Sequence, residues 1–112
     1  MVDGGCGDFS IGSRLASKFD EYLALDVSSR IVEINKSRYA DLCASGRVTF
    51  GFMDMTSTTF PPTDLVLIRQ VLQHLTNAQI QKILNNIEAS QWRRVLITEQ
   101  VFNLTSDLRT YA

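Results

Sequence analysis

The feature that most constrains the fold of this chain is a series of five short apolar runs, separated by helical patterns or long polar stretches. The run at 65–68 has no polar alternation, as expected for a strand that is covered on both faces. Parallel strands need crossovers of about a dozen residues or more, and the spacing of the runs provides them. The sequence therefore predicts a doubly wound α/β fold with a five-stranded, mainly parallel sheet. The predicted strands are 1–2, 22–25, 48–53, 65–68 and 94–98.

Helix signals lie between these runs. Ser10 is a candidate N-cap for the first helix, and Ser28 is a candidate N-cap for a second helix that stops before Gly46. The clearest helix begins with a capping box at 76–79, whereas 56–63 reads as a loop that contains two prolines. The apolar faces predicted for the first and last of these helices are Ile11, Leu15 and Phe19, and Ile80, Ile83, Leu84 and Ile87.

Composition and charge exclude several classes of function. The length of 112 residues fits one domain, and its hydrophobic fraction of 45% is ordinary for a globular protein. The 11 basic and 12 acidic residues are mixed, so no basic stripe indicates a nucleic-acid partner. No apolar run approaches the roughly 20 residues of a membrane span, and no secretory signal is present, so a cytoplasmic location is expected. Cys6 and Cys43 lack metal-ligand spacing, which argues against a zinc site.

Polar or glycine-rich residues follow most of the predicted strands. The carboxyl ends of parallel strands meet at one edge of a sheet, where ligands of such folds bind. The first strand ends in the glycine-rich stretch 3–8, directly before a helix. Glycines allow the backbone to approach a ligand, and a helix N-terminus offers unpaired amide groups. The alternative interpretation is a tight turn that binds nothing.

Two further acids end the second and third strands. Asp26 lies 19 residues after Gly7, close to the spacing at which nucleoside-binding sheets place a ribose acceptor; its alternative role is a helix cap. Asp54 can accept a hydrogen bond from an exocyclic amine, with Met55 against the base plane. The alternatives are a turn-starting aspartate and a core methionine, and for Met55 alone the core is favoured.

Taken together, these stretches resemble the class I S-adenosylmethionine-dependent methyltransferases. The resemblance runs from residue 2 to about residue 101, and it includes the segment 64–75, which is similar to the family's fourth-strand motif. It implies the strand order 3-2-1-4-5 and S-adenosylmethionine as cofactor. The cofactor-binding residues that it implies are Asp3, Gly5, Cys6 and Gly7 at the methionine part, Asp26 at the ribose, Val27, Asp54 and Met55 at the adenine, and Arg69 near the amino group.

The residues themselves separate this site from a nicotinamide site. A dinucleotide fingerprint would place a third glycine at position 10, where this chain has serine. Asp3 suits a ligand with an ammonium group and would repel a pyrophosphate. One departure from the family is Phe9, at a position that is often glycine; it is expected to pack beneath the helix or to cover the methionine part.

The expected reaction is an in-line displacement at a sulfonium, on a small-molecule acceptor. The cofactor supplies the reactive centre and the protein supplies orientation, so no covalent nucleophile is required. His74 is a weak candidate for a general base, and loop packing is the favoured alternative. Cys6 between two glycines is interpreted as a small residue rather than as a reactive thiol.

The chain also looks like an incomplete methyltransferase core. The first predicted strand is short, nothing before it can form a covering helix, and the family's last two strands are missing. We expect a cofactor-binding core at 1–102, an irregular tail at 103–112, and an uncovered sheet face through which the chain can self-associate. The alternatives are a non-catalytic cofactor-binding remnant or interaction module, and a different nucleotide-binding α/β protein.

Overall fold

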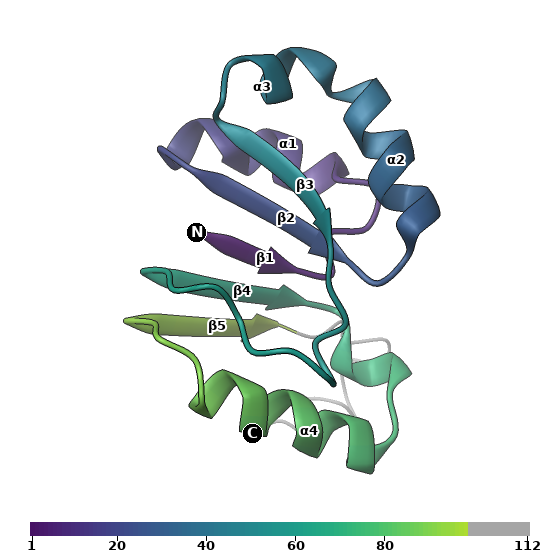
Figure 1. Ribbon diagram of the computed structural model, residues 1–112, viewed down its shortest axis with the longest axis vertical. Coiled ribbons are helices and arrows are strands. Elements are labelled where there is room, and N and C mark those ends of the chain that lie inside the picture. Colours follow the sequence, from purple (N-terminus) through teal and green to yellow (C-terminus); the bar gives the residue numbers. More distant parts are fainter. Residues whose placement is uncertain (99–112) are drawn as a thin grey trace, which may run out of the picture.

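A five-stranded parallel sheet organises residues 1–98, the part of the chain that the computed structural model describes (Figure 1). Its strands lie in the order β3-β2-β1-β4-β5, and every neighbouring pair is parallel. The predicted fold class and strand order are therefore confirmed. The predicted end of the core at 102 and the predicted tail lie outside the described residues. The strands are β1 (Val2–Gly4), β2 (Tyr22–Asp26), β3 (Val48–Phe52), β4 (Leu65–Arg69) and β5 (Arg94–Thr98).

Helices connect these strands, and two of the predicted helix starts are confirmed. The Ser28 hydroxyl accepts a hydrogen bond from the Ile31 amide at 3.3 Å. Thr76 and Gln79 form a complete capping box, in which each side chain bonds the other residue's backbone amide. The helices are α1 (Ser10–Leu15), α2 (Ser29–Arg38), α3 (Ala40–Ala44) and α4 (Asn77–Glu88), with 3₁₀ helices at Ala16–Lys18 and Leu72–His74.

Two helical predictions were wrong in detail. Ser10 is the first residue of α1, and the N-cap is Phe9, which has a left-handed φ of 65°. The second predicted helix is interrupted at Tyr39, which separates α2 from α3. The Tyr39 ring packs edge-on against the Phe9 ring, with centroids 5.1 Å apart. Helical spacing does not encode this tertiary contact, so it overrides the local pattern.

Helices cover both faces of the sheet, as a doubly wound fold requires (Figure 1). Side chains alternate along β2, so that Tyr22 and Ala24 face one core and Leu23 and Leu25 face the other. The core under α1, α2 and α3 contains Cys6, Phe9, Ala16, Tyr22, Ala24, Val32, Val48 and Phe50. The core under α4 contains Val2, Leu25, Met53, Met55, Phe60, Val66, Ile68, Ile83 and Ile87.

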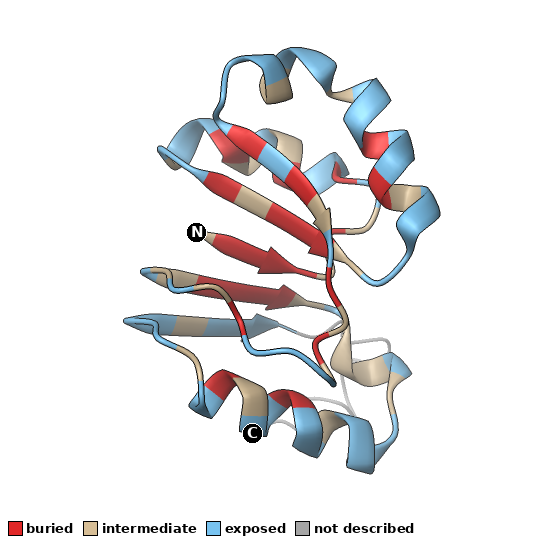
Figure 2. Ribbon diagram, viewed as in Figure 1, coloured by how far each residue is buried: buried red, intermediate tan, exposed pale blue. Residues whose placement is uncertain are grey.

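Strand β5 is the exposed edge of the described sheet (Figure 2). Val95 packs against the core under α4, whereas Leu96 is 51% exposed. Leu96 pairs in register with Leu67, so it belongs to the face opposite α4. Within residues 1–98, no helix covers this part of the sheet (Figure 1). The helices of this same range are also too short or too polar to cross a membrane.

Candidate cofactor site

The turn after β1 is built from glycines that the local geometry requires. Gly5 and Gly7 have positive φ angles of 84° and 56°. A Cβ atom on Gly5 would lie 2.5 Å from the Val71 Cγ2 atom, so the turn passes close beneath the end of β4. A Cβ atom on Gly7 would meet no atom of the described part of the chain within 4 Å. The turn is therefore packed at Gly5 and open at Gly7.

Asp26 is joined directly to this turn. Its Oδ2 atom accepts a hydrogen bond from the Gly7 amide at 3.0 Å, and its Oδ1 atom accepts one from the Ser28 amide at 3.0 Å. The cap of α2 is Ser28, so Asp26 is not the helix cap that the sequence left open as an alternative. Each carboxylate oxygen has a second lone pair, so Asp26 retains acceptor capacity. The structure thus brings together the glycine turn and the acid that the sequence predicted beside it.

Val27, the next residue, presents apolar surface to solvent. Its side chain is 61% exposed, although valine is a residue that folding usually buries. It follows directly on Asp26, at the carboxyl edge of the sheet. A planar apolar group of a ligand that bonds Asp26 would therefore find an apolar surface next to it.

Asp54 follows β3 and forms a turn of its own. Its Oδ1 atom accepts hydrogen bonds from the amide and the hydroxyl of Thr56, at 2.9 and 2.6 Å. The Thr56 hydroxyl and then its amide lower the pKa of this carboxyl, which stays ionised at neutral pH. The Oδ2 atom has no hydrogen bond to a described residue, so it remains an acceptor at the carboxyl edge. The turn-starting interpretation and an acceptor role are compatible at this residue.

Met55 belongs to the core rather than to the surface of the site. It is only 9% exposed, and its Sδ atom lies 2.6 Å from the position that a Cβ atom on Gly4 would take. Its carbonyl oxygen accepts a hydrogen bond from Asn86 at 2.7 Å. The core alternative therefore describes the Met55 side chain.

Asp3 is enclosed by protein. It is 0% exposed, and its Oδ2 atom accepts a hydrogen bond from the Tyr22 hydroxyl at 2.5 Å and contacts the Arg69 Nη2 atom at 3.3 Å. Burial raises the pKa of the Asp3 carboxyl, and the Tyr22 hydroxyl and the Arg69 charge act in the opposite direction. Direct contact between this carboxylate and a ligand stays a prediction, and in the structure Tyr22 and Arg69 occupy the Asp3 Oδ2 atom. The Arg69 side chain turns toward Asp3, and the place near the cofactor's amino group that the family resemblance implied for Arg69 stays a prediction.

Cys6 lies in the turn as a buried, unreactive thiol. Its side chain is 4% exposed, and burial, followed by the charge of Asp3, raises its pKa to about 12. The reactive form of cysteine is the thiolate, which is negligible at neutral pH with such a pKa. The interpretation of Cys6 as a small packing residue therefore fits the structure.

Sequence reasoning missed Asn35, which holds the turn from below. This residue of α2 is completely buried, and its amide nitrogen donates to the Gly7 carbonyl oxygen at 2.8 Å. A polar residue on the inner face of α2 was the available signal, because a buried amide must find a partner. Together with Asp26, Asn35 fixes both the amide and the carbonyl of Gly7.

Phe9 takes the first of the two roles that the sequence left open. It is 0% exposed and packs beneath α1, in edge contact with Tyr22, Tyr39 and Phe50. Its φ of 65° lies in the region that favours glycine, which gives a physical reason for glycine at this position in the similar family.

The segment after β4 contains the remaining candidate, His74, and a residue with a left-handed backbone, Gln70. Gln70 has a φ of 55°, and its amide donates to the Thr98 carbonyl oxygen at 2.7 Å, which ties β4 to β5 at the carboxyl edge. His74 is exposed, in the 3₁₀ helix that follows, and its Nε2 atom lies 3.3 Å from the Gln73 side-chain nitrogen. No group of three or more potential metal ligands occurs within residues 1–98.

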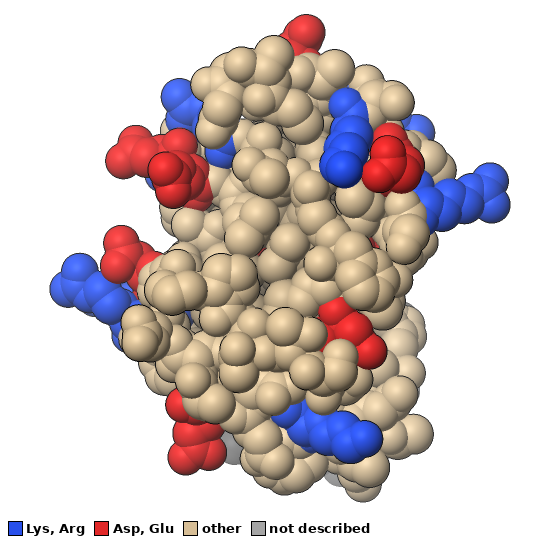
Figure 3. All heavy atoms as spheres, in the orientation of Figure 1, with Lys and Arg blue, Asp and Glu red and all other residues tan. Residues whose placement is uncertain are grey.

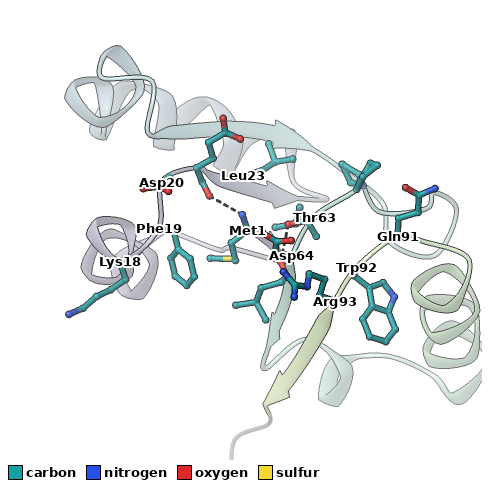
Figure 4. A pocket seen from close by; sticks show the side chains of 15 residues that line it. Met1, Lys18, Phe19, Asp20, Leu23, Thr63, Asp64, Gln91, Trp92 and Arg93 are labelled. Atoms are coloured by element: carbon teal, nitrogen blue, oxygen red, sulfur yellow. Dashed lines mark hydrogen bonds between the residues drawn. The ribbon is translucent and has the colours of Figure 1, made fainter.

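A hollow of about 1010 Å³ lies at the opposite edge of the sheet, where the strands begin (Figure 4). Its labelled side chains come from the residue before β1, the segment before β2, β2 itself, the loop before β4 and the turn before β5. Asp20 and Arg93 are among them, and none of the predicted cofactor-binding residues lines it. The two edges of the sheet are therefore chemically distinct.

These features define a class of protein: a parallel α/β sheet with an open glycine turn and an acid at the end of the neighbouring strand. The family described as "Methyltransferase domain" matches residues 2–90, and the chain belongs to this family. A comparison with curated proteins found no match.

Solved structures share the fold. A phosphoethanolamine N-methyltransferase from Haemonchus contortus, in complex with phosphoethanolamine and S-adenosylhomocysteine, has a TM-score of 0.70 and 19% identity over 91% of this chain and 22% of its own. The DhpI-SAM-HEP complex has a TM-score of 0.75 and 17% identity, over 98% of this chain and 50% of its own. The glycopeptide N-methyltransferase MtfA with S-adenosylhomocysteine has a TM-score of 0.75 and 18% identity, over 86% of this chain and 41% of its own. This chain therefore spans half or less of each of these three proteins.

Proposed function

We propose that this chain binds S-adenosylmethionine at the carboxyl edge of its sheet and forms the cofactor-binding core of a small-molecule methyltransferase. The observation that carries the proposal is the bridge that Asp26 makes between the amides of Gly7 and Ser28, beside a turn that is open at Gly7. A carboxylate that is fixed in this way is ready to accept from vicinal hydroxyls of a ribose. Membership in the methyltransferase domain family supports the choice of ligand.

In this proposal, each residue of the site contacts a different part of S-adenosylmethionine. Gly5 and Gly7 let the backbone approach the methionine part, and Asp26 accepts from the ribose. Val27 packs on the adenine, and the Asp54 Oδ2 atom accepts from its amino group. S-adenosylmethionine supplies an electrophilic methyl group when bound, and these residues hold it in one orientation, which is how a protein accelerates an in-line displacement.

The chain's own groups take little part in the chemical step. The buried Cys6 thiol is protonated, so it is no nucleophile. His74 is exposed just beyond β4, and it serves as a base only for an acceptor that must lose a proton. Acidic and basic side chains are interspersed over the face seen in Figure 3, which favours a small acceptor over a polyanion.

The first experiment is calorimetry with S-adenosylhomocysteine and with nicotinamide adenine dinucleotide. We expect the protein to bind S-adenosylhomocysteine and not the dinucleotide. Asp26→Ala should lower the affinity for S-adenosylhomocysteine about tenfold to a hundredfold, because a hydrogen bond to a charged group contributes about 1.5–3 kcal/mol. The matched control is Asp20→Ala, at an exposed acid beside the hollow at the other edge. Equal affinity of the two variants, or preference for the dinucleotide, would contradict the proposal.

A second candidate function is a cofactor-binding module that does not transfer methyl groups. The observation that favours it is the fold similarity to the [4+2]-cyclase SpnF, with a TM-score of 0.60 and 26% identity over 74% of this chain and 32% of that protein. The fold therefore hosts a protein named for another reaction. Formation of S-adenosylhomocysteine from S-adenosylmethionine in the presence of candidate acceptors separates the two functions, because the module alone would bind the cofactor without consuming it.

A further inference from the structure

The contact between Asp3 and Arg69 is an incomplete ion pair. Arginine and a carboxylate commonly form two parallel hydrogen bonds, one to each oxygen. Here the Arg69 Nη2 atom contacts only the Oδ2 atom, at 3.3 Å, and the Tyr22 hydroxyl donates to that same oxygen. The Asp3 Oδ1 and Arg69 Nε atoms are both buried and have no hydrogen-bond partner among residues 1–98. The Nε donor of Arg69 is therefore unused in its contact with Asp3.

Stability does not explain such an arrangement. Burial of two charges costs several kcal/mol per ion, and only a fully hydrogen-bonded geometry offsets that cost. An unsatisfied buried donor or acceptor adds a further cost of about 1–3 kcal/mol. The pair fits a site whose last partner is a ligand better than it fits a structural ion pair.

The sheet register places this pair beside the glycine turn. Gly4 is in register with Ile68, so Arg69 at the end of β4 comes level with Gly5. Asp3 is in register with Leu67, and Arg69 lies two residues further along the same strand, so the Asp3 and Arg69 side chains share one face of the sheet. Asp3 is fully enclosed, whereas the Arg69 side chain is 18% exposed. Arg69 is thus the member of the pair that a ligand at the turn can reach.

We propose that Arg69 binds the α-carboxylate of the methionine part of S-adenosylmethionine, with Asp3 and Tyr22 as positioning residues. This inference rests on the function proposed above. A guanidinium has five N–H donors in a fixed plane. Asp3 is the only described residue that accepts a hydrogen bond from Arg69. The other N–H groups of Arg69 can therefore donate to a second carboxylate, whose geometry they match. Asp3 keeps the guanidinium on this face, and the Tyr22 hydroxyl keeps the Asp3 oxygen in place.

The test compares two ligands that differ by the carboxylate alone: S-adenosylhomocysteine and its decarboxylated analogue, which keeps the nucleoside, the thioether and the amine. Dissociation constants are measured by calorimetry for the wild-type protein, Arg69→Met and Arg69→Lys. We expect the wild type to prefer S-adenosylhomocysteine about tenfold to a hundredfold, the range of a charge-assisted hydrogen bond. Arg69→Met removes the preference and leaves the affinity for the analogue unchanged, and Arg69→Lys restores part of the preference because it keeps the charge.

Each result has a separate meaning. Equal affinity of the wild-type protein for both ligands overturns the role of Arg69 and leaves the proposed function intact; this comparison needs no variant, so it survives if Arg69→Met fails to fold. Loss of affinity for both ligands by the same factor in Arg69→Met assigns Arg69 to structure and overturns the inference as well. Failure of the wild type to bind either ligand contradicts the proposed function itself. Tyr22→Phe is expected to reduce the preference by less than Arg69→Met, because it disturbs only the positioning of Asp3.

Discussion

At the scale of single residues, the glycine turn depends on a complementary fit between Phe9 and Gly12. Phe9 has a left-handed backbone and fills the core beneath α1, and Gly12 on that helix leaves room for its ring. A Cβ atom on Gly12 would lie 2.4 Å from two atoms of the Phe9 ring and 2.9 Å from the Tyr22 hydroxyl oxygen. The same Tyr22 hydroxyl bonds Asp3, so packing under α1 is coupled to the buried ion pair.

The first prediction follows from this fit. Gly12→Ala should lower the free energy of unfolding by about 1–3 kcal/mol, the usual cost of overpacking, although alanine favours helices. Urea denaturation followed by circular dichroism measures the change. Ser17→Ala, at an exposed position in the following 3₁₀ helix, is the matched control and should stay within about 0.5 kcal/mol of wild type. A Gly12→Ala protein as stable as the control would show that Phe9 and Tyr22 readjust freely.

The second prediction concerns pH, because Asp3 and Asp54 are shifted in opposite directions. Burial raises the Asp3 pKa in the folded state, so the folded protein binds more protons than the unfolded chain at and above the unfolded value of about 3.9. The contribution of Asp3 to stability is therefore greatest at low pH and falls as pH rises through this window. The Thr56 bonds lower the Asp54 pKa, so its contribution is present above about pH 3.9 and is lost as pH falls toward the folded pKa.

Unfolding free energies of wild type, Asp3→Asn and Asp54→Asn, measured by urea denaturation between about pH 3 and 7, check these signs. The difference between wild type and Asp3→Asn should decrease with rising pH, and the difference between wild type and Asp54→Asn should increase. Parallel slopes for the two variants would contradict the assignment of opposite shifts.

At the scale of the secondary-structure elements, the two halves of the sheet are stabilised in different ways. The β1–β3 half is covered by α1, α2 and α3, with an aromatic cluster at its centre. The β4–β5 half depends on α4, whose Ile83 and Ile87 are its only fully buried residues. Leu84, predicted to lie on the same apolar face, is 39% exposed. The first turn of α4 therefore depends on its capping box as well as on this packing.

The third prediction tests this dependence. Thr76→Ala removes the N-cap acceptor of α4 and should lower the free energy of unfolding by about 1 kcal/mol. Thr58→Ala, at an exposed loop position, is the control. Native-state hydrogen exchange should also show faster opening of the α4 amides in Thr76→Ala than in the control. Equal exchange in both variants would mean that packing alone holds the first turn of α4.

At the scale of the whole molecule, ligand binding at the carboxyl edge is expected to affect the stability of both halves of the sheet. The proposed site joins segments from the ends of β1, β2 and β3, and Arg69 adds the end of β4, so a ligand bound there would bridge both halves of the sheet. The exposed Leu96 and the half-covered β5 leave the β4–β5 half with less apolar burial. Ligand binding should therefore stabilise the entire described fold as one unit.

The fourth prediction gives this coupling a magnitude. S-adenosylhomocysteine at a hundredfold excess over its dissociation constant should raise the free energy of unfolding by about 2.7 kcal/mol, because the ligand binds only the folded state. Thermal denaturation with and without ligand measures the shift, and the tenfold to hundredfold weaker binding of Asp26→Ala should reduce it to about 0.4–1.4 kcal/mol at the same ligand concentration. A thermal shift as large in Asp26→Ala as in the wild type would place the ligand elsewhere in the molecule.

The resemblance to a known family implied the order of the strands, and the sequence by itself determined the parallel sheet, the caps at Ser28 and Thr76 and the acid beside the glycine turn. These features follow from apolar periodicity, capping chemistry and spacing, which act over short stretches of chain. The tertiary structure alone decided which side chains the site exposes: Asp3 is enclosed, Met55 is in the core, and Asn35 supports Gly7. Burial of a side chain depends on neighbours that are distant in sequence, such as Tyr22 and Arg69 for Asp3. A local sequence pattern does not predict these neighbours.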